Sequence, residues 1–273
     1  MKTITKSEVS KVVSNLIADV SDFMQSERFK LWLETDMHFR HSKENARRIM
    51  RQMPKATRVT TENEWRELGR EVRFEAEPIL IVSDAPNIRS PTESSSGTVH
   101  LSCNQPKLLE LYDISQTVGV PLPKLIHPLK GNATTHQRLF DVLCSVSPVP
   151  VTVTDSLPCY AYGSYSGTEI LIQKNSSKLH QCKSLIHELS HVLYDYRKYG
   201  KTNIHQSRIR AEAVACVVLR CLGIDSYSYS IGYISQYLSE CKTNELSEQF
   251  TVITNLSFRM LSKIQQQKLN IDL

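Results

Sequence analysis

Apolar side chains recur every three to four positions from residue 7 to residue 53, and neither Pro nor Gly interrupts them. This spacing places the apolar positions on one face of a helix. Pro54 ends the pattern, because proline is excluded from a helix interior. We therefore expect helical structure over residues 7–53.

The pattern changes after Pro54. A short helix is expected at residues 62–69, and the alternation at 71–74 and the apolar run at 78–82 indicate strands. The Pro- and Ser-rich stretch 84–97 has the composition of a loop or lid. The front part of the chain thus mixes helix and strand.

The second half repeats this mixture. A helix is expected at residues 134–145, strands at 149–153 and 169–172 around a Tyr- and Gly-rich hairpin, and two or three helices after them. We place the domain boundary near residues 130–132. The predicted fold class is α+β in two domains, an N-terminal helical and β-hairpin domain at 1–130 and a C-terminal domain at 131–273.

Composition supports two domains. The chain has 273 residues, 40% of them hydrophobic, which is enough for two cores. The longest apolar runs fall well short of the ~20 residues that cross a bilayer, and the N-terminus lacks the features of a signal peptide. Seven scattered cysteines without a Cys-x-x-Cys pair indicate neither a disulfide framework nor a cysteine zinc site. We expect a cytoplasmic protein with no membrane partner.

The chemistry is concentrated in His187-Glu188-Leu189-Ser190-His191. In a helix, positions i and i+4 lie on one face, so His187 and His191 can aim two imidazoles at a single Zn²⁺ ion. Glu188 would then take a proton from zinc-bound water. A helix can also carry this short pattern by chance, but the flanking apolar residues 185, 186, 189, 192 and 193 favour a buried helix.

A catalytic zinc site needs a third protein ligand. Between His191 and residue 225 the acids are Asp195, Glu212 and Asp225. Glu212 is the candidate, because the small and apolar residues around it predict a buried helix and a buried carboxylate needs a partner. A salt bridge to Arg208 is the alternative explanation. The tyrosines near the motif, such as Tyr229 and Tyr233, suit either an oxyanion contact or aromatic packing.

The net charge of +5 is too small to indicate a nucleic-acid partner by itself, but residues 40–58 carry seven basic side chains against one acid. Trp32, Phe39 and Trp65 flank this segment. Basic residues that neutralise phosphates and aromatic rings that stack on bases suit single-stranded nucleic acid. A solvated helix face over core aromatics is the alternative.

Several motifs together resemble a known family. In the N-terminal half these motifs are residues 39–45, 52–59, 65–72 and 112–119. In the C-terminal half they are residues 185–193, 211–215, 222–225 and 232–234. In order and spacing they resemble the antirestriction proteins of the ArdC and LtrC type, found on plasmids, conjugative elements and phages. The resemblance implies an N-terminal domain that binds single-stranded DNA, with Arg40, Asn45, Arg58, Trp65 and Arg70 at the matching positions.

For the second half, the resemblance implies a zincin-like metallopeptidase domain related to ImmA/IrrE proteases. Two departures stand out. Residues 73–78 are more acidic than the Lys- and Gly-rich turn of the relatives, and Arg208 stands where ImmA/IrrE proteases have an acidic zinc ligand. Arginine cannot bind zinc, so either Glu212 takes over the coordination or the site is weakened or lost.

We therefore expect an antirestriction-type protein of a phage or mobile element that binds single-stranded DNA and carries a Zn²⁺-dependent peptidase-like site for an unidentified protein substrate. One alternative is a DNA-binding antirestriction module on a non-catalytic peptidase scaffold. Another is a regulatory protease that cleaves a repressor without binding DNA.

Overall fold

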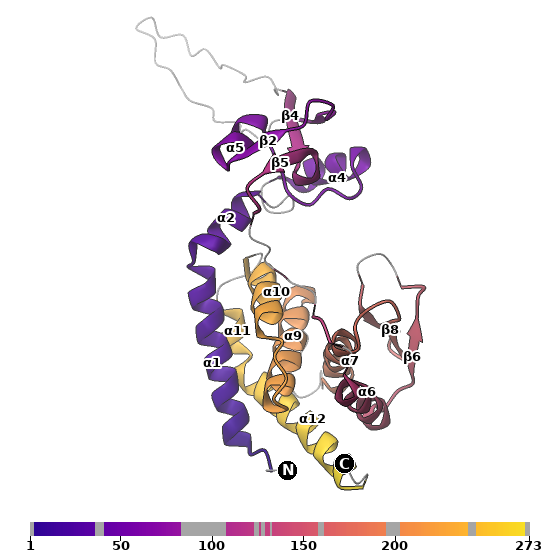
Figure 1. The fold of residues 1–273 in the computed structure, drawn as a ribbon. Helices are drawn as coiled ribbons and strands as arrows, with labels where there is room; N and C mark the ends of the chain where they lie inside the picture. Colours follow the sequence, from indigo (N-terminus) through magenta and orange to yellow (C-terminus); the bar gives the residue numbers. More distant parts are fainter. Residues whose placement is uncertain are drawn as a thin grey trace, which may run out of the picture. The chain divides into compact units, whose positions relative to one another are not determined.

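The computed structural model describes residues 3–35, 41–82, 108–122, 126, 129–131, 133–157, 161–194, 203–239 and 244–270. The chain forms two compact units (Figure 1). Unit 1 comprises Met1–Ser26 and Leu125–Leu273, and unit 2 comprises Glu27–Lys124. Each unit contains both helices and strands, so the predicted α+β class is confirmed.

Helix α9 (Ile204–Cys221) is the centre of unit 1. Residues 209–219 are all buried, which is why this stretch is small or apolar on every face apart from Arg210 and Glu212. Around α9 lie five other helices: α1 (Lys6–Met24), α7 (Lys178–Leu193), α10 (Tyr227–Ser239), α11 (Glu245–Glu248) and α12 (Phe250–Asn270). Helix α6 (Thr134–Val146) packs against α7 and α12.

The N-terminal helix α1 belongs to unit 1. Thr5 begins it with a capping box that includes Glu8, and its apolar stripe of Val9, Val13, Leu16 and Val20 is fully buried. These residues pack against α9, α10 and α12. The division therefore differs from the expected 1–130 and 131–273: an amphipathic pattern predicts a buried face but not which part of the chain covers it.

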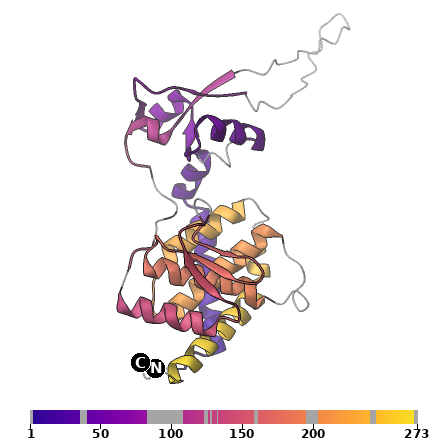
Figure 2. The ribbon, with the colours of Figure 1, turned by 90° about the vertical axis from the view of Figure 1, so that its right-hand side faces the viewer.

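A small sheet completes unit 1. Its strands are β6 (Val151–Thr154), β7 (Gly163–Tyr165) and β8 (Ile170–Gln173) in the order β6-β8-β7, with β6 parallel and β7 antiparallel to β8. The sheet lies over one side of the helices (Figure 2), and β7 and β8 contact α7. Edge strand β7 is thereby brought alongside the helix that carries the histidine pair.

Unit 2 is built on two small antiparallel sheets. One has the order β1-β4-β3, formed by β1 (Val59–Thr60), β4 (Leu108–Asp113) and β3 (Ile79–Val82), and the other pairs β2 (Arg70–Val72) with β5 (Thr117–Gly119). The other elements among the described residues of unit 2 are α2 (Glu27–Thr35), α4 (Lys43–Gln52), α5 (Glu62–Glu67) and the 3₁₀ helix η1 (Ile114–Gln116).

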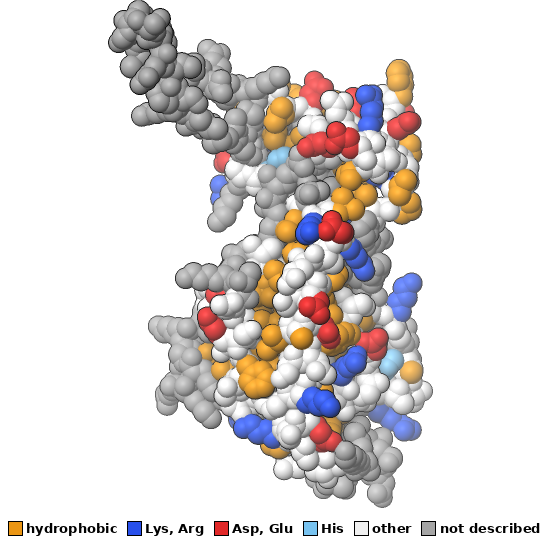
Figure 3. Space-filling view, turned by 90° about the vertical axis from the view of Figure 1, so that its left-hand side faces the viewer, with side chains coloured by type: hydrophobic (Ala, Val, Ile, Leu, Met, Phe, Trp, Pro, Cys, Tyr) orange, Lys and Arg blue, Asp and Glu red, His pale blue; other side chains and the backbone are white. Residues whose placement is uncertain are grey.

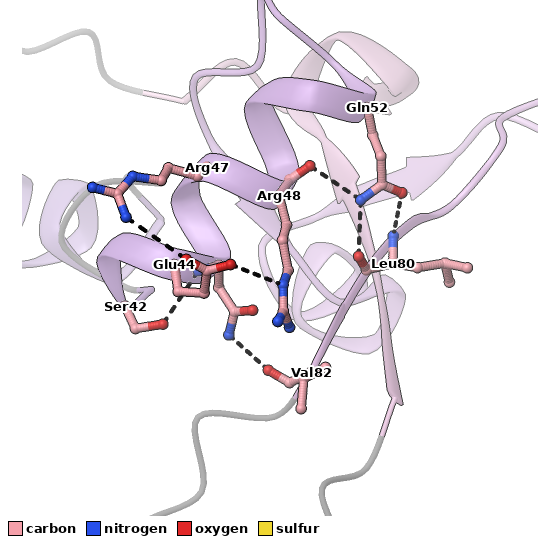
Figure 4. A network of polar contacts seen from close by, with 8 residues as sticks. Ser42, Glu44, Arg47, Arg48, Gln52, Leu80 and Val82 are labelled. Carbon is pink, nitrogen blue, oxygen red and sulfur yellow. Dashed lines mark hydrogen bonds and ion pairs between the residues drawn. The ribbon is translucent and has the colours of Figure 1, made fainter.

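Side-chain amides of α4 hydrogen bond along strand β3 (Figure 4). Gln52 Nε2 donates to the carbonyl of Leu80 at 2.8 Å, and Gln52 Oε1 accepts from the Leu80 N–H at 3.0 Å. Asn45 Nδ2 donates to the carbonyl of Val82 at 2.6 Å. These bonds satisfy backbone groups that β4 does not pair, as an edge strand requires.

Most of the elements expected from the sequence are present. The described residues of the expected helical stretch 7–53 form α1, α2 and α4, and the strands expected at 78–82 and 169–172 are β3 and β8. The expected loop at 84–97 lies outside the described residues. Among the helices described here, none is both long and apolar enough to span a membrane.

Candidate functional site

Helix α7 places the histidine pair inside unit 1. Ser177 caps its N-terminus by accepting from the His180 N–H, and residues 179–190 are all buried. The predicted buried helix is confirmed. The ring centroids of His187 and His191 lie 5.2 Å apart on the same face, as the i, i+4 spacing requires.

Glu212 is fully buried on α9 and faces His187. His187 Nδ1 lies 3.1 Å from Glu212 Oε2, and the ring N–H donates because an ionised carboxylate can only accept. Ser230 on α10 donates to Oε1 at 2.8 Å. The ammonium of Lys183 lies 2.5 Å from Oε2. The ion-pair partner of Glu212 is thus Lys183, whereas Arg208, the partner considered from sequence, donates to Tyr237 Oη at 2.6 Å.

His191 has its own polar partner. Its Nδ1 lies 3.2 Å from Ser207 Oγ, which also accepts from Arg210 Nη2 at 3.0 Å. The guanidinium of Arg210 stacks on the ring of Tyr194, 3.6 Å from its centroid. Both imidazoles therefore use Nδ1 for these contacts, which leaves Nε2 as the nitrogen that could bind a metal ion. Metal-bound histidines use their two ring nitrogens in this way.

Glu188 lies between α7 and strand β7. Gly163 lies so close that a Cβ there would be 3.1 Å from both Cγ and Oε1 of Glu188, so a larger residue would displace the carboxylate. Burial raises the pKa of Glu188, while His187, Lys183 and a backbone hydrogen bond from Tyr165 act in the opposite direction. A carboxyl with a raised pKa is suited to carrying a proton.

Burial and charge set the protonation of the other groups. Burial alone would raise the pKa of Glu212, but Lys183 and His187 lower it to about 2. Burial lowers the pKa of His191 to about 3, and the nearby His187, Arg210 and Arg208 lower it further. Near neutral pH the site therefore holds an ionised Glu212 and a neutral His191.

Three tyrosines of α10 line this region. Tyr229, Tyr233 and Tyr237 follow one another at four-residue spacing, with ring centroids 6.2 Å and 4.8 Å apart. Lys183 lies 4.3 Å from the centroid of Tyr229, and Arg208 lies 5.3 Å from that of Tyr237. The aromatic-packing explanation for Tyr229 and Tyr233 is supported, with their rings facing cations.

These residues do not fit a three-ligand zinc site. The oxygens of Glu212 are occupied by Lys183, His187 and Ser230, and Arg208 takes the position one helical turn before it. Within the described part of the chain, no three His, Cys, Asp or Glu side chains come together in a group that could hold a metal ion. In this arrangement Glu212 contacts His187, and its role as a zinc ligand stays a prediction.

The positions expected to bind DNA are mostly buried in unit 2. Trp65 is fully buried and its Nε1 donates to the carbonyl of Tyr112 at 2.8 Å. Arg70 donates to Thr117 Oγ1 at 2.8 Å and to backbone carbonyls of β5 and Val120. Asn45 and Arg58 are also buried. These side chains hold the unit together, and a role in DNA binding stays a prediction. Arg40 lies outside the described residues.

Other basic and aromatic side chains of unit 2 reach solvent. Arg47 and Arg48 are 68% and 39% exposed and pair with Glu44 at 3.7 Å and 3.5 Å, while Arg51 and Lys55 are exposed beside them. Phe74 is fully exposed in the turn after β2. Sequence reasoning could have found the exposed arginines, since the apolar residues of α4 mark its buried face and leave residues 47 and 51 on the other.

Comparisons with known proteins gave matches among solved structures. No family model matches the sequence, and no curated protein matches it. Among solved structures, the chain is similar to the antirestriction ArdC protein from the R388 plasmid, in a Mn(II)-bound and a metal-free crystal structure. The identities are 13% and 15% and the TM-scores 0.33 and 0.35, over 96% of this chain and 98% of that chain.

Proposed function

We propose that this chain is an antirestriction-type protein that binds single-stranded DNA through unit 2, and that unit 1 is a peptidase-like scaffold without a catalytic metal. The antirestriction type, and with it an origin in a phage or mobile element, rests on the sequence motifs. The DNA-binding proposal rests on the exposed basic side chains of α4. The scaffold proposal rests on the contacts of Glu212.

The basic side chains of α4 form a surface suited to a phosphate backbone. Arg47 and Arg51 are four residues apart and share one face of the helix, with Arg48 between them and Lys55 just beyond the helix end. The acid of α4, Glu44, is exposed and shared by two arginines, so these ion pairs are weak. By contrast, basic and acidic side chains are interspersed over the face of unit 1 drawn in Figure 3.

Phe74 supplies the aromatic element of the same proposal. A fully exposed phenylalanine gains little from packing within the chain, and its face is free to stack on an unpaired base. The turn is closed by the Ala76 N–H, which donates to the carbonyl of Arg73 at 3.0 Å. Glu75 and Glu77 follow closely, so Arg73 is the basic side chain that can reach a phosphate from this turn.

The scaffold proposal follows from charge and ligand chemistry. Peptide hydrolysis with a zinc-bound water needs three protein ligands and an open position. His187 and His191 could supply two of these ligands. The carboxylate of Glu212, however, is paired with Lys183, and Arg208 adds a positive charge that acts on Glu188 and His191. The negative charge of Glu212, which a metal ion would neutralise, is already neutralised by Lys183.

The experiment that tests the DNA-binding proposal is a fluorescence anisotropy titration of the full chain against a labelled oligothymidine and against a duplex of equal length. We expect tighter binding to the single strand, weakening steeply as KCl rises. Equal binding to both, or no binding at low salt, would refute it. Binding to the single strand would also exclude the regulatory protease that does not contact DNA.

A metallopeptidase acting on a protein substrate is the second candidate function. It is favoured by one observation: the Nδ1 contacts of His187 and His191 leave both Nε2 atoms as the available ring nitrogens, next to a Glu188 whose pKa is raised by burial. Unit 1 would then need Zn²⁺ and a third ligand. Zinc-dependent cleavage of casein by the wild type that is absent in Glu188→Gln would establish this candidate and exclude the scaffold.

A further inference from the structure

Lys183 is the least expected residue of the peptidase-like site. It lies four residues before His187 on α7 and is only 4% exposed. Its ammonium contacts Glu212 Oε2 at 2.5 Å and lies 4.3 Å and 5.1 Å from the ring centroids of Tyr229 and Tyr233. A buried ammonium is costly unless a carboxylate and polarisable surfaces surround it, and both are present here.

The contacts of Glu212 neutralise its negative charge and provide donors to both of its oxygens. One oxygen accepts from Lys183 and His187, and the other accepts from Ser230. The carboxylate carries one negative charge and Lys183 one positive charge, so the buried pair is neutral. A divalent ion on His187 would add two positive charges next to an ammonium that already holds the nearest carboxylate.

Arg208 adds a second cation on the same face of α9 as Glu212, one helical turn earlier. Its guanidinium is held by the hydroxyl of Tyr237 at 2.6 Å and lies 5.3 Å from the centroid of that ring. Its charge acts on both His191 and Glu188. The histidine pair is therefore flanked by one cation from its own helix, α7, and one from α9.

We propose that buried Lys183 and exposed Arg208 are the protein's own cations that replace a metal ion in this site, so that the native chain binds no divalent metal. Lys183 neutralises Glu212, and through it fixes the ring of His187. Arg208 stands one helical turn before Glu212 on α9, and its charge acts on His191 and Glu188. This inference rests on the scaffold role proposed for unit 1 and is independent of DNA binding.

The first test measures metal content. The wild type and its variants are equilibrated with excess ZnCl₂, desalted and analysed by mass spectrometry for zinc. We expect no stoichiometric zinc in the wild type or in Arg208→Gln, and a gain of about one zinc per chain in Arg208→Glu, which offers a third donor to the histidine pair. Arg220→Glu, an equal charge change at an exposed position of α9, is the matched control and should gain none.

Stoichiometric zinc in the wild type would overturn the inference. So would a folded Arg208→Glu variant that gains no zinc. If the wild type holds zinc but does not cleave casein, the inference fails while the scaffold role survives. If it also cleaves casein in a Glu188-dependent manner, both fail.

The second test measures the ion pair directly. Lys183→Met leaves a buried carboxylate and Glu212→Gln leaves a buried ammonium, so each should lower Tm strongly. The double variant removes both charges and should lose less than the sum of the two single changes. EDTA should leave the wild-type Tm unchanged. Additive losses in the double variant, or a fall in Tm with EDTA, would contradict the role of Lys183.

Discussion

The ammonium of Lys183 on α7 lies 2.5 Å from the carboxylate of Glu212 on α9, and both side chains are buried. This contact joins the helix that carries the histidine pair to the central helix of unit 1. It also explains how Glu212 stays ionised in an apolar interior. The stability of unit 1 should therefore depend on pH in a definite direction.

Acid should destabilise the protein in two stages. Burial lowers the pKa of His191 to about 3 and that of His180 to about 4, both from 6.5. The unfolded chain binds the protons that these histidines exclude, so stability falls as the pH drops below 6.5. Glu212 has a folded pKa of about 2 against 4.5 ordinarily, so its contribution is complete above pH 4.5 and is lost as the pH falls toward 2.

Urea unfolding of the wild type and of Glu212→Gln between pH about 7 and pH about 3 checks this prediction. The wild type should lose stability throughout the range. The variant should keep the loss that begins below pH 6.5 and lack the later part that belongs to Glu212. Wild-type stability that does not change with pH over this range would contradict the assignment.

Trp65 should matter for stability and not for DNA affinity. Replacing it by phenylalanine removes the N–H that donates to the Tyr112 carbonyl, and the lost hydrogen bond alone costs about 0.5–1.5 kcal/mol. Thermal unfolding should show the loss. Oligothymidine affinity, measured at a temperature where the variant is folded, should stay as in the wild type. A large loss of affinity without a loss of stability would restore Trp65 as a DNA contact.

Phe74 should show the opposite behaviour. Its side chain is fully exposed, so Phe74→Ala should leave the unfolding temperature unchanged. If the ring stacks on a base, the variant should bind oligothymidine roughly 5- to 150-fold more weakly, corresponding to ~1–3 kcal/mol. Phe74→Tyr keeps an aromatic face and is the control that should bind like the wild type. Unchanged affinity in Phe74→Ala would remove the turn from the interface.

The histidine pair shows what the sequence can predict. Apolar residues on both sides of His187 and His191 predict a buried helix, and that prediction is confirmed. The burial of Glu212 follows from its small and apolar neighbours in the same way. The identity of its ion-pair partner cannot be predicted in the same way, because Lys183 comes from another helix and residue spacing does not show how two helices pack.

Unit 2 shows a different limit. The motif positions Trp65 and Arg70 are marked by residue type and order, but these do not tell whether a side chain faces solvent or the interior. Arg70 is turned inward because Thr117 and the backbone of β5 offer it acceptors. The apolar positions of α4 identify its buried face. The exposed basic face on the other side can therefore be predicted from the sequence alone.

The most direct test of the proposed function is the salt dependence of single-strand binding when charge is removed from α4. Arg47→Gln combined with Arg51→Gln should weaken oligothymidine binding and lower the slope of log Kd against log salt by about 0.7 for each lost phosphate contact. The matched control, Arg66→Gln, removes an exposed arginine of unit 2 that is paired with Glu62 and should bind with the wild-type slope. Equal slopes for the wild type, the double variant and the control would contradict a DNA interface on α4.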